Sequence, residues 1–157
     1  MDKVNIGVIT MKISTKGRYG TRALLDLALH KESEPILLKD IARRQDISLR
    51  YLEQIIPPLV TGGLIRSIRG ARGGIVLAKD TREINVSDII RILEGSIAPV
   101  ECIDNPSMCE RSVSCVTRDV WNELKEAIDN VLQSTTLQDL VERHKIKRQA
   151  KEPMYFI

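Results

Sequence analysis

Residues 38–54 read LKDIARRQDISLRYLEQ, and residues 64–78 read LIRSIRGARGGIVLA. The first stretch holds two helical patterns separated by a short turn, and Ser48 at the end of the turn is a typical helix N-cap. The second stretch alternates, turns through glycines and returns as a strand, which predicts a two-stranded hairpin. A further helix is expected over residues 14–30, upstream of both stretches. Three helices followed by a hairpin is the order of a winged helix–turn–helix.

Two other helices are predicted, together with one interruption. Pro57-Pro58 is expected to kink or restart the third helix, because a proline lacks an amide hydrogen and disfavours helical dihedrals in the residue before it. Asn85 can cap a fourth helix over residues 86–94. Thr136 can cap a last short helix that ends near His144.

A long helix is predicted near residues 117–133, where one apolar stripe follows helical spacing. Its members are Val120, Trp121, Leu124, Ala127, Ile128, Val131 and Leu132. The expected fold is therefore mainly α with a small β wing: a winged helix–turn–helix plus a long dimerisation helix.

The chain is expected to divide into a DNA-binding part and a part with another task. Residues 11–80 carry a net charge of +6, and residues 81–157 carry −3. A basic front half suits a polyanionic partner. The predicted segments are an N-terminal extension (1–10), from an upstream start or from outside the native protein; the DNA-binding region (11–80); a connecting helix (81–98); a cysteine loop (99–116); the dimerisation and last helices (117–145); and a flexible tail (146–157).

The third helix carries the predicted base contacts. Arg50 and Gln54 lie four residues apart, on one face near the N-terminal end, which in helix–turn–helix proteins enters the major groove. Arginine can bind guanine and glutamine can bind adenine there. Ser48 belongs to the same predicted contact surface. Tyr51 has two readings, a packing residue or a phosphate contact.

Two arginines flank the glycines of the predicted wing, Arg69 and Arg72. Glycine permits a tight turn and a close approach to the sugar–phosphate backbone. The plain alternative is a small hairpin with solvated arginines. Because the hairpin follows a helix–turn–helix pattern, we expect both arginines to contact DNA.

Three cysteines, Cys102, Cys109 and Cys115, lie within fourteen residues of a polar, proline-containing segment. Clustered thiolates suit a soft metal or an iron–sulfur cluster. Structural zinc sites usually show closely paired cysteines, which this spacing lacks, so a cluster is favoured over zinc. A thiol redox switch also remains open. The odd count excludes a closed disulfide framework, and the expected location is the reducing cytoplasm, with no membrane span.

Several motifs occur in an order that resembles one family. Residues 11–19 (MKISTKGRY), 47–54 (ISLRYLEQ), 69–74 (RGARGG) and 115–121 (CVTRDVW) are similar to the IscR-type iron–sulfur cluster regulators, whose relatives include NsrR and CymR. The resemblance implies a homodimer, joined mainly through the long helix, that binds palindromic promoter DNA. It also implies a cluster, 2Fe–2S, held by the three cysteines, and control of cluster-assembly and cysteine-desulfurase genes.

One departure from this family concerns the fourth ligand of the cluster. Where IscR proteins carry a histidine three residues after the third cysteine, this chain has Arg118. Where other members supply a carboxylate from the partner's first helix, it has Arg18. A guanidinium stays protonated and cannot ligate a metal. The remaining candidates are a small molecule or one of Glu101, Asp104, Glu110, Asp119, His30 and His144.

Three other functions are weighed against a cluster-sensing regulator. The cysteines could hold zinc or act as a thiol switch in a DNA-binding protein, or the chain could be a cysteine-metabolism repressor of the CymR kind that responds to a bound protein. An electron carrier or redox enzyme would leave the recognition helix and the wing unexplained. No catalytic residues are predicted, and the chain is expected not to be an enzyme.

Overall fold

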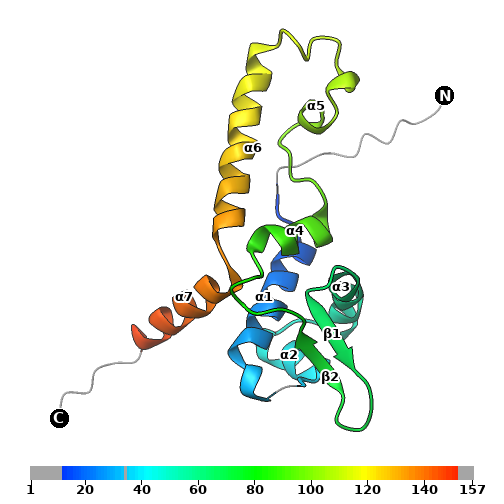
Figure 1. Cartoon of the computed structure of the whole chain (residues 1–157), viewed down its shortest axis with the longest axis vertical. Helices are drawn as coiled ribbons and strands as arrows, with labels where there is room; N and C mark the ends of the chain where they lie inside the picture. Colours follow the sequence, from blue (N-terminus) through cyan, green and yellow to red (C-terminus); the bar gives the residue numbers. More distant parts are fainter. Residues whose placement is uncertain (1–11, 34, 152–157) are drawn as a thin grey trace.

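The structure, a computed structural model, describes residues 12–33 and 35–151 and is mainly helical (Figure 1). The predicted extension, residues 1–10, lies outside the described residues. The elements in chain order are α1 (Thr15–Leu29), η1 (Lys31–Ser33), α2 (Leu38–Gln45), α3 (Leu49–Thr61), β1 (Ile65–Ile68), β2 (Gly74–Leu77), α4 (Val86–Glu94), α5 (Glu101–Asp104), η2 (Pro106–Met108), α6 (Val116–Ser134) and α7 (Leu137–Gln149).

The first part of the chain, α1 to α4 with the hairpin, forms what we call the winged-helix body. Its hairpin is antiparallel, with Ile65 opposite Leu77 and Ile68 opposite Gly74. Ile36 extends this sheet by one bridge to Ile75. Gly74 permits that approach, because a Cβ atom at this position would collide with the backbone of Ile36. The body therefore has the predicted winged-helix arrangement, with strands within one residue of the expected bounds.

The core of the body is apolar and continuous from α1 to α4. Each of these helices contributes side chains with no exposed surface, and α7 adds one residue to the same cluster: Leu24, Leu27, Ile41, Leu52, Ile55, Leu59, Ile84, Ile89 and Leu137. Burial of one such side chain stabilises the fold by about 1.5–3 kcal/mol. The relative positions of α1, α2 and α3 are set by this shared core.

The prediction that the third helix breaks at its prolines is wrong. The helix α3 runs without interruption from Leu49 to Thr61, with Pro57 and Pro58 inside it. Two backbone hydrogen bonds are lost, to the carbonyls of Glu53 and Gln54. Both of these residues are exposed, so water can satisfy their carbonyl groups. Buried side chains on both sides of the prolines hold the helix together.

The second part of the chain, α5, η2 and α6, forms what we call the cysteine arm. Figure 1 shows α6 leaving the body and reaching the far end of the molecule, where it meets the segment that contains α5. The segment before α6 was predicted without regular structure, yet it contains the short helices α5 and η2. None of the nineteen residues of α6 is buried.

The last helix returns to the body. Thr136 caps α7 as predicted, in a capping box with Asp139, and the amide of Leu137 donates to the carbonyl oxygen of Ile84 at 2.7 Å. The predicted end near His144 is wrong, because α7 continues to Gln149. Basic residues in its last turn favour this extension through the helix dipole. Within the described residues, no helix is long and apolar enough to span a membrane.

Candidate nucleic-acid interface and cysteine segment

The recognition helix α3 begins as the sequence predicts. The hydroxyl of Ser48 accepts a hydrogen bond from the backbone amide of Tyr51 at 3.4 Å and so caps the helix. Arg50 and Gln54 are exposed, and within the described residues neither side chain forms a hydrogen bond or an ion pair with the protein. Both are therefore available to a partner, as base contacts must be.

Tyr51 is partly buried and packs against the core of the body. Its ring meets that of Tyr19 edge-on, with 5.7 Å between the ring centroids. The guanidinium of Arg22 lies 5.4 Å from the centre of the Tyr19 ring. Of the two predicted readings, the structure favours packing: Tyr51 joins the recognition helix to α1.

A buried ion pair, which the sequence reasoning missed, fixes the turn before α3. Asp26 on α1 is only 1% exposed. Its carboxylate accepts hydrogen bonds from Nε and Nη2 of Arg44 and from Nε2 of Gln45. Arg22, one turn earlier on α1, donates to both the side chain and the backbone carbonyl of Gln45. We call this group the Asp26 clamp, because it ties α1 to the end of α2.

The position of the clamp explains its structural effect. Gln45 is the last residue of α2, and Asp46 follows in the left-handed conformation (φ 51°) that turns the chain toward α3. The hydrogen bonds with Asp26 raise the pKa of the Arg44 guanidinium, so the pair stays charged. One sequence signal was available: Asp26 lies three residues after Ala23, on the apolar face of α1, where a lone carboxylate needs a partner.

The wing presents the two predicted arginines. Arg69 and Arg72 are both exposed at the tip of the hairpin. Gly70, between them, has φ 110°, a backbone conformation that other residues rarely adopt. The recognition helix and the wing thus place their polar side chains outward from one body.

The three cysteines lie on different parts of the arm. Cys102 is in α5, Cys109 follows η2, and Cys115 is the residue before α6. All three are free and partly exposed. In the part of the chain that the structure describes, no three His, Cys, Asp or Glu residues are gathered closely enough to hold a metal ion. The donor chemistry of three thiols fits an iron–sulfur cluster, but the segment does not bring them together.

Arg118 lies at this segment and holds it to α6. Its Nε donates to the backbone carbonyl of Cys102 at 3.1 Å. Of the candidate fourth ligands, Asp104 accepts a hydrogen bond from Ser96, and His30 lies at the end of α1, in the body. His144 is on α7, which also lies apart from the cysteine segment (Figure 1). The structure therefore assigns no fourth ligand within the chain.

Cys115 is the most reactive in its surroundings. A hydrogen bond with the hydroxyl of Thr117, 3.2 Å from its sulfur, lowers the pKa of the Cys115 thiol, and the backbone of Arg118 lowers it further. Thiolate is the form that binds metals and reacts with oxidants.

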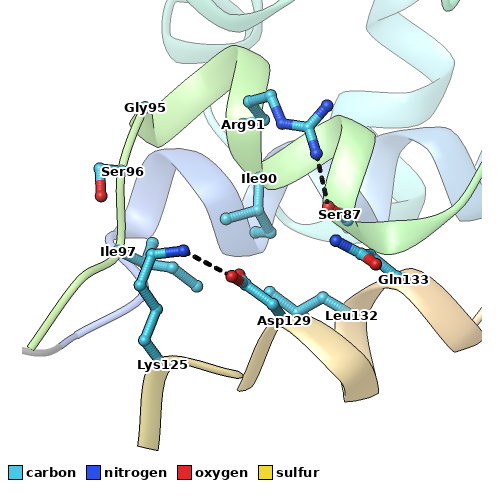
Figure 2. A pocket seen from close by; sticks show the side chains of 10 residues that line it. All are labelled: Ser87, Ile90, Arg91, Gly95, Ser96, Ile97, Lys125, Asp129, Leu132 and Gln133. Atoms are coloured by element: carbon cyan, nitrogen blue, oxygen red, sulfur yellow. Dashed lines mark hydrogen bonds and ion pairs between the residues drawn. The ribbon is translucent and has the colours of Figure 1, made fainter. Parts of the chain in front are cut away.

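A cavity of about 370 Å³ separates α6 from α4, where the arm joins the body (Figure 2). Arg91 and Ser87 line it from α4, and they are hydrogen-bonded to each other at 3.3 Å. Lys125 and Asp129 line it from α6, as an ion pair of 2.6 Å. The joint between arm and body is thus polar and incompletely filled.

Comparisons with known proteins agree with this architecture. The family described as Rrf2, Iron-dependent Transcriptional regulator, matches residues 13–143. The chain is 45% identical over 131 residues to protein rrf2 of Nitratidesulfovibrio vulgaris (83% of this chain, 87% of the relative). It is 45% identical over 130 residues to the HTH-type transcriptional regulator CymR of Bacillus subtilis (83% and 89%).

A solved structure, IscR of T. potens, matches 96% of this chain and all of that one, with 42% identity and a TM-score of 0.76. Relatives named after iron–sulfur regulation and after cysteine regulation therefore resemble the chain to a similar degree. The chain belongs to the Rrf2 family of transcriptional regulators.

Proposed function

We propose that this Rrf2-family regulator binds palindromic promoter DNA as a cytoplasmic homodimer and senses iron–sulfur cluster supply through its cysteine arm. Its targets would be cluster-assembly and cysteine-desulfurase genes. The observation that carries the proposal is the presence of three partly exposed thiols on the one part of the molecule that has no role in the core. In this proposal Ser48, Arg50, Gln54, Arg69 and Arg72 contact the DNA.

The dimer is supported by the apolar stripe on α6. Trp121 is 39% exposed, Val120 55% and Val131 63%, although all three lie on the predicted stripe. Large apolar side chains that remain exposed along one helix mark an interaction surface. A second copy of α6 would cover them.

Cys102, Cys109 and Cys115 would hold the cluster, a 2Fe–2S centre that supplies a redox-sensitive inorganic core. The lowered pKa of Cys115 favours the ligating thiolate. Ligation requires the other two thiols to move toward it, which the short helices α5 and η2 can permit, because within the described residues they bury no side chain. If the cluster binds only the gathered arrangement, cluster supply shifts the arm between two conformations.

A second function is supported by two observations: Arg118 stands where a fourth ligand is expected, and the thiols are not gathered. In that case the chain is a CymR-like repressor that senses cysteine metabolism or oxidation, without a cluster. Cys115, with its lowered pKa, would then be the thiol that reacts first.

Anaerobic purification followed by iron, sulfide and zinc quantification separates these functions. The proposal expects iron and acid-labile sulfide in equal amounts, with a visible absorption spectrum. The variant Cys109→Ala should lose both, while the matched variant Ser112→Ala, in the same segment, should keep them. Wild-type protein that contains neither iron nor sulfide after reconstitution would support the CymR-like function, and stoichiometric zinc would support a zinc site.

A further inference from the structure

The C-terminal half of α7 carries the highest density of positive charge among the described residues. Residues 143–151 contain five cations and no carboxylate, a net charge of +5: Arg143, Lys145, Lys147, Arg148 and Lys151. Residues 81–142, immediately before them, have a net charge of −7. The overall acidic balance of the second half of the chain therefore conceals a strongly basic end.

All five cations are exposed, and within the described residues none forms an ion pair of 4.0 Å or less. Arg143, Lys147 and Lys151 follow one another at four-residue spacing and therefore share one face of the helix. Cations in the last turn, such as Arg148, stabilise a helix through its dipole. That effect does not account for Arg143 or Lys145, which lie before the last turn, or for Lys151, which follows the helix.

This basic end is attached to the DNA-binding body and not to the arm. Leu137 is fully buried in the core of the body, and Val141 is buried one turn later. The Thr81 hydroxyl donates to the Gln138 side chain at 2.6 Å, and the amide of Val86 donates to the carbonyl oxygen of Thr135 at 2.9 Å. These bonds fix the direction of α7 where it leaves the body.

Along the long axis of the molecule, α7 lies toward the same end as the wing, whereas the cysteine segment lies at the other end (Figure 1). We propose that residues 143–151 of α7 bind the phosphate backbone of duplex DNA that flanks the site read by α3 and the wing. The inference deepens the proposed function and rests on it. Phosphate is the complementary partner because the contact needs positive charge on long, mobile side chains and no fixed geometry. About 12 Å of helix carries the five cations.

The test uses the full-length chain and a duplex of arbitrary sequence, about 30 base pairs or roughly three helical turns long. The variant Lys145→Gln/Lys147→Gln/Arg148→Gln removes three cations and leaves Arg143, which interacts with Asp139 inside the helix. The control variant Lys31→Gln/Arg82→Gln/Arg111→Gln removes the same charge from three other exposed positions. Thermal melting by circular dichroism checks that both remain folded.

Affinity is measured as a function of salt, between about 50 and 200 mM. Each lost phosphate contact should reduce the slope of log affinity against log salt by about 0.9, so the α7 variant should lose up to about 2.7 per protomer. At low salt it should bind about tenfold more weakly than the control.

Three results would overturn the inference. Equal salt slopes for the α7 variant and the wild type would show that α7 does not touch DNA. Equal losses in the α7 variant and the control would show that only net charge matters. A weaker dimer with an unchanged slope would assign the basic end to a second copy of the chain. Wild-type protein that binds no duplex at all would refute the proposed function as well.

Discussion

The winged-helix body and the cysteine arm are built by opposite rules. In the body, apolar side chains of α1, α3 and α4 meet in one core, and the buried carboxylate of Asp26 has a full set of partners. In the arm, α6 is of similar amphipathic design but buries no residue. The difference teaches that the body is complete as a single chain, whereas the arm still has surfaces and thiols to satisfy.

The largest expected difference between the two regions concerns their ion pairs. Asp26→Ala should lower the free energy of unfolding by about 3 kcal/mol, because it leaves Arg44 partly buried without its partner. Asp129→Ala is the matched change in the arm, where the pair with Lys125 is more exposed, and should cost less than about 1 kcal/mol. Urea unfolding of both variants measures the comparison. Equal losses would show that the Asp26 clamp is no more than a surface ion pair.

Trp121 tests whether the arm is completed by a second copy. Trp121→Ala should weaken dimerisation by about 2 kcal/mol, because large aromatic side chains dominate protein interfaces. The neighbouring variant Asn122→Ala removes only an exposed side chain that is hydrogen-bonded to Glu126. Sedimentation equilibrium measures both. If the two variants dimerise equally well, the apolar stripe of α6 is not the dimer contact.

The body should read DNA through α3. Arg50→Ala and Gln54→Ala should each weaken binding to the specific site by about 1–3 kcal/mol and relax discrimination at one base pair. Arg82→Ala removes an exposed cation of the body outside α3 and the wing. Gel-shift titrations with single-base variants of the site measure the change. Discrimination that stays intact in both α3 variants would exclude them as base contacts.

The smallest effect is expected at Cys115. Thr117→Val removes the hydroxyl that lowers the pKa of this thiol, so the pKa should rise. Because thiolate is the reactive form, the midpoint of the alkylation rate against pH should move to higher pH. Peptide mapping after timed alkylation measures the rate at each cysteine, with Ser114→Ala as the control. An unchanged midpoint would show that Thr117 does not stabilise the thiolate.

Local signals explain why much of the fold was predictable. Asn85 and Thr136 both form the predicted caps, and α4 has the predicted bounds, Val86–Glu94. A cap works within one turn of its own helix, so the sequence nearby contains the whole cause. The long helix and the wing were equally visible, from an apolar stripe and from glycines between two alternating runs.

The predictions that were wrong, or absent, depend on distant residues. Pro57 and Pro58 stay inside α3 because the core residues on either side hold the helix in place. Asp26 and Arg44 are eighteen residues apart in sequence, so no local pattern pairs them. The three cysteines were predicted as ligands from their spacing, and that assignment remains a prediction.

By itself, the sequence determined the helix starts, the wing, the exposed Arg50 and Gln54, and the presence of three thiols in a polar segment, because each depends on neighbouring residues. Only the tertiary structure decided that Asp26 fixes the turn before α3, that Arg118 holds the carbonyl of Cys102, and that α7 carries its basic end out of the body. Those features require elements that are far apart in the chain to meet, and the shared apolar core determines where the elements of the body meet.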